Sequence, residues 1–582
     1  MTLAKRLLAL TMTLALVTPG VTATTNSARA SIEAREAALF PTSVRRVRSA
    51  KGVITGTASP IAVEAGAQVL REGGTAADAA VTTALLQITA MLGANVSVAG
   101  VLQLVYYEAR TGRVQTLDAG WGSWSAEHSP TTIPTTDVSL ITGKAAPQTM
   151  GAQGRKTLVP GFMAGIEAMH RRFGRLPTHR LFAPAIWYAD HGVPITGLLS
   201  NYLATGTTQL LGTSTGRRFA MPNGSDLPRL GLRYVQPELG SLYRAVVAHG
   251  AREMYRGTWA RHYVGAVRAA GGVATMADMA AYAPRWGGPL TTDFGGATIA
   301  GPDAQNISSC ATLEALNLIQ HAKRGDDVAA FRTTALALRV AMFSHWDATA
   351  AAFERAAGVG GNCLARMTPV YGATASAALP AMLDGNTDRA PEGHHSASVV
   401  VADRWGNVAA LVHSSNTPIW GDSGMVVDGV PIPVPASTYR HLLVSLRPGD
   451  RVPSDMAPIL VLNRGKPVAA VATIGSSLIP ETVRLVTALR QPIELASVLS
   501  APPLLLNYED QTLPALAREE FIPAGRYPRA FLDRVRAQGL RLRELNATRT
   551  LYVRGTPAVI VDSRDGWRGA EVPSVFAFTA VQ

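Results

Sequence analysis

The sequence predicts a mixed α/β fold of the α+β type, in which strands from both ends of the chain enter one layered core. Strand-like segments occur near the N-terminus, a mainly helical region spans 158–290, and strand-like segments return in the C-terminal third. This order is typical of layered proteins with helices packed on sheets. With 582 residues, of which 47% are hydrophobic and 16% charged, the chain has enough apolar material for two to four domains.

The first elements follow a polar leader that is expected to be loose over 24–50. A short strand is expected over 52–57, where the residues are mainly β-branched or small. Ser59 and Pro60 then predict the start of a helix, because Ser caps a first turn and Pro is tolerated at the first helical position. This helix is expected over 61–71, and a pair of glycines ends it.

An alanine-rich second helix is expected over 76–92. Two strand-like runs at 102–107 and 114–117, separated by a Thr-Gly turn, then predict a hairpin. The stretch 79–107 carries no charged residue, but it contains Thr, Gln, Asn, Ser and Gly. We therefore interpret it as a buried helix followed by a buried strand, not as a membrane span.

The C-terminal part predicts four strands and a helix. Apolar, β-branched runs occupy 398–402, 408–413, 459–462 and 468–472. A helical pattern follows over 481–489. These strands are expected to join those of the N-terminal part in one core.

The N-terminus has the pattern of a secretory signal. Lys5 and Arg6 precede an apolar run over 7–17, and a small-x-small motif favours cleavage after Ala23. The sequence thus predicts a signal peptide over 1–23 and a secreted or periplasmic protein. An uncleaved membrane anchor is the alternative.

The net charge of +13 comes mainly from Arg residues, which are scattered apart from a denser region over 526–543. A solvated basic surface is the simpler interpretation, and no nucleic-acid partner is expected. The two cysteines, Cys310 and Cys363, permit one disulfide but lack metal-ligand spacing. His394 and His395 are adjacent and would point opposite ways on an extended chain. Neither a metal site nor a cofactor is therefore predicted.

The most informative stretch begins at Ser396. This residue opens a β-branched run that ends in an Asp-x-x-Gly-Asn turn over 403–407, and a polar cluster follows at 413–416. A hydroxyl at the start of a buried strand suits an N-terminal nucleophile (Ntn) hydrolase, which cuts its own chain before that residue and uses the freed amine as a base. A hairpin with a polar entry is the simpler alternative on this stretch alone.

An ordered series of short motifs resembles the γ-glutamyltransferases, also called γ-glutamyltranspeptidases or glutathione hydrolases. The resemblance covers about residues 50 to 580. It implies a self-cleaving precursor, a four-layer αββα Ntn sandwich, and large and small subunits over 24–395 and 396–582. The motifs are Ser59-Pro60, Ala65-Gly66, Leu70-Arg71-Glu72-Gly73-Gly74, Ala76-Ala77-Asp78-Ala79-Ala80, Val159-Pro160-Gly161, Leu181-Phe182-Ala183-Pro184, Tyr255-Arg256-Gly257 and Ala269-Ala270-Gly271-Gly272.

An ungapped alignment on the Asp-x-x-Gly-Asn turn places the family's nucleophilic Thr on Ser396. A shifted alignment would place it on His394, but that requires a gap inside a strand, where register fixes the surroundings of every side chain. A histidine also cannot form the ester that self-cleavage requires. In the same register, the Thr that hydrogen-bonds the nucleophile's amine falls on Ser414, and the substrate-binding Asn falls on Asn416.

The resemblance assigns four further positions. The family's Ser pair before Met-x-Pro falls on Ser454 and Asp455, so only the first serine is retained and both are expected to face substrate. The Gly-Gly oxyanion donors fall on Gly475 and Ser476. A backbone N–H can fill this role whatever the side chain, so the change to Ser is tolerable.

Other departures affect recognition of the γ-glutamyl group. Gly120 replaces the Arg that grips its α-carboxylate, and the segments 95–100 and 431–435 replace a Gly-rich segment and the amine-binding residues. A buried carboxylate without its Arg would be left unpaired. We therefore expect a small-molecule amide or acyl substrate other than an ordinary γ-glutamyl compound. The alternatives are cleavage of a C–C bond beside a carbonyl, as in alkylproline-type antibiotic biosynthesis, and an inactive homologue that acts as a binding or scaffold protein.

The segment Gly421-Asp422-Ser423-Gly424 also matches the nucleophile loop of trypsin-like proteases. A four-residue match is common by chance, and the chain lacks both the disulfides and the order of elements of such enzymes. We do not favour this interpretation.

Overall fold

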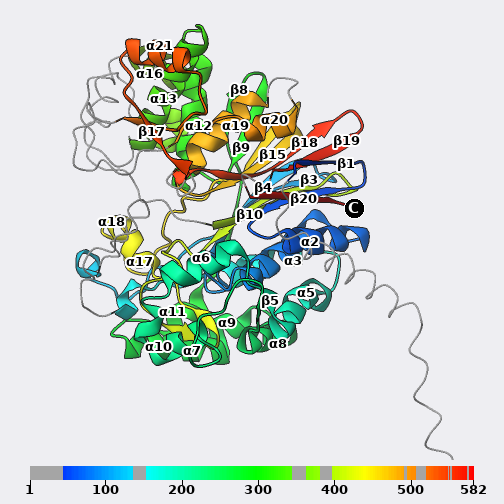
Figure 1. The fold of residues 1–582 in the computed structure, drawn as a ribbon, viewed down its shortest axis with the longest axis vertical. Coiled ribbons are helices and arrows are strands. Elements are labelled where there is room, and N and C mark those ends of the chain that lie inside the picture. The colour runs from blue at the N-terminus through cyan, green and yellow to red at the C-terminus, as the bar shows by residue number, and fades with distance from the viewer. Residues whose placement is uncertain are drawn as a thin grey trace, which may run out of the picture.

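The computed structural model describes residues 43–134, 153–343, 362–379, 396–489, 494–505, 519–547, 550, 553–572 and 576–582. The predicted signal peptide (1–23), His394 and His395 lie outside these residues. Two seven-stranded antiparallel sheets stack face to face, and helices cover both outer faces (Figure 1). The αββα sandwich implied by the resemblance is thus confirmed.

The first sheet joins strands from both ends of the chain. Its central strands are those that the sequence predicts around the Asp-x-x-Gly-Asn turn and in the N-terminal hairpin. The strand order is β20 (Ala577–Val581), β2 (Val53–Thr57), β10 (Ser396–Ala402), β11 (Val408–Ser414), β3 (Val101–Glu108), β4 (Arg113–Ala119) and β7 (Arg285–Gly287).

The second sheet packs on the inner face of the first. The side chains between the two sheets are buried and mainly Val, Ile and Ala, for example Val400, Val412 and Ile474. The strand order is β1 (Arg45–Ser49), β19 (Gly566–Glu571), β18 (Thr556–Ser563), β15 (Lys466–Ile474), β14 (Ile459–Asn463), β9 (Ala297–Gly301) and β8 (Leu290–Phe294).

Each sheet has its own layer of helices. α2 (Pro60–Arg71) and α3 (Ala76–Ala90) pack on the outer face of the first sheet, and α12 (Ile307–His321) and α19 (Leu478–Ala488) pack on that of the second (Figure 1). The helical middle extends the first of these layers with α4 (Phe162–Phe173), α5 (Thr178–His191), α6 (Gly197–Gly206), α7 (Ser214–Ala220), α8 (Pro237–His249), α9 (Arg252–Arg256), α10 (Thr258–Ala269) and α11 (Met276–Ala281).

The remaining described elements are short or peripheral. The helices are α13 (Asp327–Phe343), α15 (Cys363–Arg366), α16 (Pro369–Ala378), α17 (Pro435–Thr438), α18 (Arg440–Leu443), α20 (Leu495–Ser500) and α21 (Arg529–Ala537). Three two-stranded ribbons complete the set: β5 (Val193–Pro194) with β6 (Arg233–Tyr234), β12 (Val426–Val427) with β13 (Val430–Pro431), and β16 (Glu520–Pro523) with β17 (Leu542–Leu545).

Most sequence-predicted elements are confirmed with small boundary changes. The Ser59 Oγ accepts a hydrogen bond from the Ala62 N–H at the start of α2, as a cap should. The prediction of a loose leader up to residue 50 is wrong at its end, because Arg45–Ser49 form the edge strand β1 against β19. Alternate residues of this strand are half-buried, so a strand rich in Arg still covers the sheet edge.

Two other points left by the sequence are settled. Cys310 of α12 and Cys363 of α15 form a disulfide with a Cα–Cα distance of 5.8 Å. The charge-free stretch is a buried helix followed by the buried strand β3, as predicted. Within the described part of the chain, no helix is long and apolar enough to span a membrane.

Candidate active site

Ser396 is the first residue of β10 and lies directly opposite Ser414 of β11. The Ser396 Oγ donates a hydrogen bond of 2.9 Å to the Ser414 Oγ. Both side chains are buried, with exposed fractions of 6% and 0%. The structure therefore brings together the two hydroxyls that the sequence predicts as nucleophile and positioning group.

The turn after β10 fixes this register. The Asp403 carboxylate accepts hydrogen bonds from the backbone N–H groups of Ala76, Trp405 and Asn407. These bonds tie the hairpin to the first turn of α3. Burial raises the pKa of Asp403, although its hydrogen bonds act in the opposite direction. A shift of one residue in β10 would turn Ser396 away from the second sheet.

Asn416 extends the hydrogen-bonded chain beyond the strand. Its backbone N–H donates to the Ser414 Oγ at 2.9 Å, and its side-chain Nδ2 donates to the Asp455 Oδ1 at 3.1 Å. Its Oδ1 accepts from the indole Nε1 of Trp121 at 3.3 Å. The φ angle of Asn416 is +45°, a left-handed conformation that Asn adopts more readily than most residues. The Asn416 side-chain amide is thus hydrogen-bonded through both its nitrogen and its oxygen.

Asp455 ends this chain and faces a pocket. The Tyr439 hydroxyl also donates a hydrogen bond to its carboxyl. Burial raises the pKa of Asp455, whereas the bonds from Tyr439 and Asn416 lower it. The neighbouring Ser454 Oγ accepts from the Met456 N–H at 3.3 Å, and the Ser454 carbonyl accepts from the Ile307 N–H at the start of α12.

Gly475 and Ser476 lie between the end of β15 and the start of α19. Gly475 has a φ of +90°, and a Cβ atom there would lie 2.6 Å from the Arg554 carbonyl oxygen, so the position requires Gly. The preceding residue, Ile474, shares the core between the sheets with Val412 of β11. A helix N-terminus adds partial positive charge at this place, as an oxyanion site needs.

A pocket of about 490 Å³ lies between Asp455 and the start of α19. The lining is mainly apolar and comprises Ile307, Ser308, Ala311, Met342, Thr438, Tyr439, His441, Leu442, Asp455 and Ile479.

The region of the missing Arg is filled in another way. Gly120 occupies the position, but the Arg451 guanidinium approaches from a distant segment and donates to the Gly120 carbonyl at 3.2 Å. The same guanidinium donates to the Tyr282 hydroxyl and the Ala283 carbonyl, and pairs with Asp118 at 3.6 Å. Arg451 therefore anchors this loop, and its donors are already engaged.

The two replaced segments are buried, and each forms a hydrogen bond with the stretch that follows Ser414. In 95–100, the Asn95 carbonyl accepts from the Ser415 N–H, and a Cβ on Gly100 would lie 2.3 Å from the Ser414 carbonyl oxygen. In 431–435, Ile432 and Val434 are buried, and the Val434 N–H donates to the Thr417 Oγ1. Neither segment offers the ionic groups that would bind a glutamyl amine.

His413 precedes Ser414 but lies on the opposite face of β11. Its Nε2 contacts the Gln87 Oε1 of α3 at 2.8 Å, and its ring packs near Phe162. Burial lowers its pKa to about 3. His413 therefore stays neutral at physiological pH and belongs to the helix-covered core, not to the site.

Sequence reasoning missed three residues of this region, namely Trp121, Tyr439 and Arg451. Trp121 directly follows Gly120, so a bulky donor beside the lost Arg was a usable signal. Tyr439 and Arg451 come from irregular segments, and no local pattern indicates where their side chains lie.

The trypsin-like segment is a structural loop. Asp422 forms a buried ion pair with Lys156, with 2.9 Å between Oδ2 and Nζ, and exposed fractions of 3% and 0%. The Ser423 Oγ accepts from the Met425 N–H at 3.2 Å. These contacts hold the loop to the segment before α4, so we assign it no catalytic role.

Lys156→Met should lower the thermal unfolding midpoint. It leaves the Asp422 carboxylate buried without its partner, at a cost of about 3–5 kcal/mol. Circular dichroism melts of the purified protein would measure this loss. Replacing both partners, as Lys156→Met with Asp422→Leu, should recover more than half of it, and the exposed Lys51→Met should change little. A double variant as unstable as the single one would contradict the pairing.

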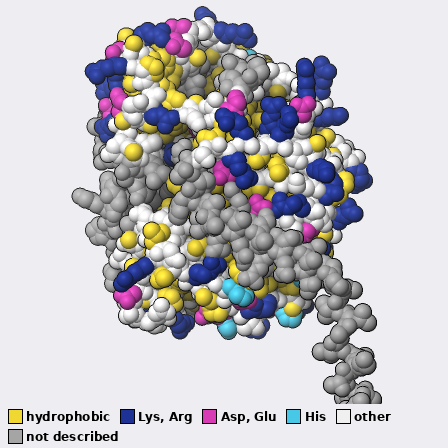
Figure 2. Space-filling model, turned by 45° about the vertical axis from the view of Figure 1, so that its right-hand side comes forward, with side chains coloured by type: hydrophobic (Ala, Val, Ile, Leu, Met, Phe, Trp, Pro, Cys, Tyr) yellow, Lys and Arg dark blue, Asp and Glu magenta, His cyan; other side chains and the backbone are white. Residues whose placement is uncertain are grey.

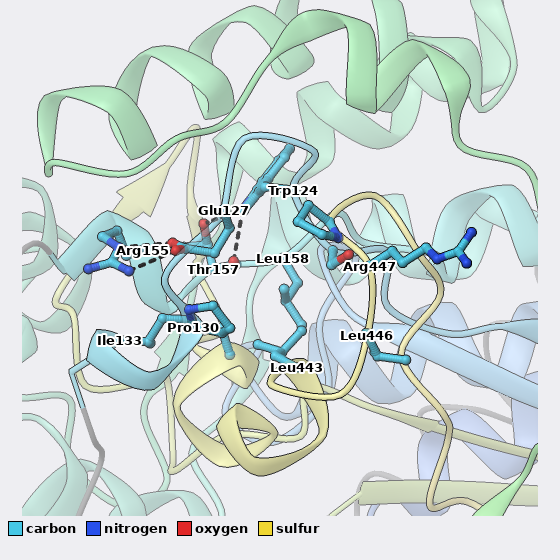
Figure 3. A pocket seen from close by; sticks show the side chains of 13 residues that line it. Trp124, Glu127, Pro130, Ile133, Arg155, Thr157, Leu158, Leu443, Leu446 and Arg447 are labelled. Carbon is cyan, nitrogen blue, oxygen red and sulfur yellow. Dashed lines mark hydrogen bonds and ion pairs between the residues drawn. The ribbon is translucent and has the colours of Figure 1, made fainter.

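A second pocket of about 310 Å³ lies apart from the hydrogen-bonded chain that runs from Ser396 to Asp455 (Figure 3). Its lining residues include Trp124, Leu158 and Leu443, and it shares none with the pocket beside Asp455. Arg155 and Glu127 pair at its wall, as the dashed line shows. We assign it no part in the chemistry.

Basic side chains and potential metal ligands are both dispersed in the part of the chain that the structure describes. Lys and Arg side chains are spread over several parts of the face in Figure 2, with acidic side chains among them. Among the residues that the structure describes, no group of three or more His, Cys, Asp or Glu side chains is placed to hold a metal ion.

Comparisons with known proteins point to one family. A family model described as gamma-glutamyltranspeptidase matches residues 62–545. The "Acylase ACY 1 proenzyme" of Pseudomonas sp. (strain V22) is 26% identical over 72% of this chain and 76% of its own length. The "Glutathione hydrolase proenzyme" of Bacillus subtilis (strain 168) is 28% identical over 48% of this chain and 46% of its own length. The crystal structure of cephalosporin acylase from Bacillus halodurans superposes with a TM-score of 0.74 at 18% identity, covering 93% of this chain and 98% of that one.

Proposed function

Given that the chain belongs to the γ-glutamyltranspeptidase family of enzymes, we propose that it is an Ntn acylase that cleaves itself before Ser396 and then hydrolyses or transfers an acyl group. Residues 24–395 form the large subunit and 396–582 the small one. The observation that carries this proposal is the buried hydrogen bond from the Ser396 Oγ to the Ser414 Oγ, at the start of a central strand. The test is the mass of the purified protein, because maturation gives two fragments.

Self-cleavage begins when the Ser396 Oγ attacks the carbonyl carbon of the preceding residue. The C–O bond forms, the peptide C–N bond breaks, and the hydroxyl proton passes to the nitrogen, which becomes the α-amine of Ser396. Water then hydrolyses the ester and releases the carboxyl end of the large subunit. Ser414 positions the attacking oxygen before the cut and the new amine after it.

The acylase reaction uses the same oxygen. The Ser396 Oγ attacks the donor amide, its proton passes to the Ser396 amine, and the backbone N–H groups of Gly475 and Ser476 stabilise the oxyanion. The amine then protonates the leaving nitrogen, and an acyl ester remains on Ser396. Water or an acceptor amine resolves this ester. An α-amine has a reference pKa near 8, which suits a base at neutral to alkaline pH.

The donor is proposed to be a small-molecule amide other than an ordinary γ-glutamyl compound. In the family, two positions hold the glutamyl group. In this chain they are occupied by Gly120 and the apolar 431–435 segment, and the Arg451 guanidinium already donates to backbone carbonyls. Cleavage of a C–C bond beside a carbonyl remains a prediction that analysis of the products would separate from amide hydrolysis.

Ser414→Ala should lower kcat by about 10- to 100-fold and raise KM by less. It removes the hydrogen bond that orients the nucleophile and base. Asn416→Ala should raise KM at least as much as it lowers kcat, because the amide is expected to hold substrate. Steady-state kinetics on cleaved protein would measure both. Ser423→Ala is the matched control and should leave kcat and KM unchanged. Equal effects of Ser414→Ala and Ser423→Ala would contradict the assigned role.

Export is proposed from the N-terminal pattern, with removal of residues 1–23. The N-terminal sequence of the mature large subunit would test this, and a start at residue 24 is expected.

A further inference from the structure

The pocket beside Asp455 has a charge character that the family resemblance does not predict. Asp455 stands where the family has a second Ser, so a neutral hydroxyl is replaced by a carboxyl group. The rest of the wall is mostly aliphatic, with Ile307, Met342 and Ile479. Among the described residues that line the pocket, none is Lys or Arg. The other groups in the lining that titrate are Tyr439 and His441.

Two residues of the pocket lining, Asp455 and Ile479, lie next to the groups of the proposed chemistry. On one side, Asp455 accepts from the Asn416 Nδ2, and the Asn416 N–H donates to the Ser414 Oγ, which accepts from the Ser396 Oγ. On the other side, Ile479 lies in the first turn of α19, just after Gly475 and Ser476. The pocket therefore adjoins Asn416 and the first turn of α19, which both neighbour the residues proposed to hold the donor carbonyl.

We propose that this pocket receives the acyl group and that Asp455 selects against donors whose acyl group ends in a carboxylate. The substrate class is then an amide of an aliphatic acyl group with a neutral or ammonium end. This inference rests on the proposed function. A carboxylate donor would meet an acidic side chain inside an apolar wall, where like charges repel strongly and the described lining holds no Lys or Arg to compensate.

The fixed position of Asp455 supports this role. Tyr439 and Asn416 both donate hydrogen bonds to its carboxyl, so the group cannot swing away from a repelled ligand without leaving two donors unpaired. An ammonium group or a neutral chain end avoids the repulsion, and the ammonium group gains an acceptor.

The test uses three anilide donors with the same five-carbon chain: pentanoyl, 5-aminopentanoyl and glutaryl. Assays are run at pH 8, because burial raises the pKa of Asp455 and an alkaline pH favours its ionised form. With cleaved wild type, kcat/KM for pentanoyl and 5-aminopentanoyl should exceed that for glutaryl by about tenfold or more. Asp455→Asn keeps the shape and removes the charge, so it should narrow the ratio of 5-aminopentanoyl to glutaryl by about tenfold or more. Asp450→Asn, a change at an exposed carboxylate, is the control and should leave this ratio unchanged.

If Asp455→Asn does not fold or self-cleave, the wild-type kcat/KM values for the three donors still test the inference. Glutaryl turnover equal to or faster than pentanoyl turnover would overturn the inference, and so would cleaved enzyme that turns over none of the three donors. A wild-type chain that stays uncut would instead overturn the proposed function, so the two failures are distinguishable.

Discussion

Ser396→Ala is expected to leave the chain uncut and to lower any turnover by at least about 1,000-fold. The Ser396 Oγ is the atom that attacks in both maturation and catalysis, and no other hydroxyl can replace it at the start of β10. Denaturing electrophoresis and intact mass would show one chain for the variant and two fragments for the wild type. The loss should be complete because it removes a reacting atom, not a positioning contact.

Two controls separate chemistry from folding. Ser396→Thr keeps the hydroxyl, adds a methyl group that a strand tolerates, and should still self-cleave. Ser398→Ala alters a buried hydroxyl two residues further along the same face, near the Thr57 Oγ1, and should also mature. An uncut Ser396→Thr together with a cleaved Ser396→Ala would contradict the assignment.

Glutathione and a γ-glutamyl anilide are expected to be poor donors, with kcat/KM lower by tens- to about 1,000-fold than for the best alternative amide. Loss of a charged two-point contact costs roughly 2–5 kcal/mol. Here Gly120 replaces the family's Arg and so supplies no guanidinium. The next residue, Trp121, donates its indole N–H to the Asn416 Oδ1. Assays on purified, cleaved protein would measure the ratio.

The same assay has an internal control. An acyl anilide without the α-amino and α-carboxyl groups keeps the scissile bond, so it isolates recognition from chemistry. If γ-glutamyl donors were turned over as fast as the best alternative amide, another cation would have to replace the missing Arg. Arg451→Gln would then show whether the Arg451 guanidinium, which lies against the Gly120 carbonyl, is that cation.

The sequence predicts the architecture well where local signals are strong. The Ser-Pro helix start, the alternating hairpin and the Asp-x-x-Gly-Asn turn each have a local physical cause, and each recurs in the structure. The second sheet was only half predicted. Its β8–β9 and β18–β19 hairpins have Gly295-Gly296 and Asp565-Gly566 at their turns, local signals that the sequence analysis did not use. The pairing of β9 with β14 and of β18 with β15 joins distant parts of the chain and has no local signal. The edge strand β1 was missed because its Arg-rich sequence resembles a solvated leader.

The candidate site was predictable to the extent that one strand register carries it. Ser396, Ser414 and Asn416 follow from the ungapped alignment, and they form one hydrogen-bonded chain. The contacts that Trp121, Tyr439 and Arg451 make could not be read from the sequence, since they join segments hundreds of residues apart or come from irregular loops. The pocket beside Asp455 likewise depends on α12, α13 and α19 packing around one carboxyl group.

The central claim is that Ser396 becomes an N-terminal nucleophile, and one measurement tests it most directly. Purified wild type is mixed with the best amide donor, quenched early in the reaction, and the intact masses of its fragments are recorded. The account predicts a small fragment that begins at Ser396, spans residues 396–582, and carries the acyl group on Ser396. A single uncut chain, or continued turnover with the added mass on another residue or on none, would contradict it.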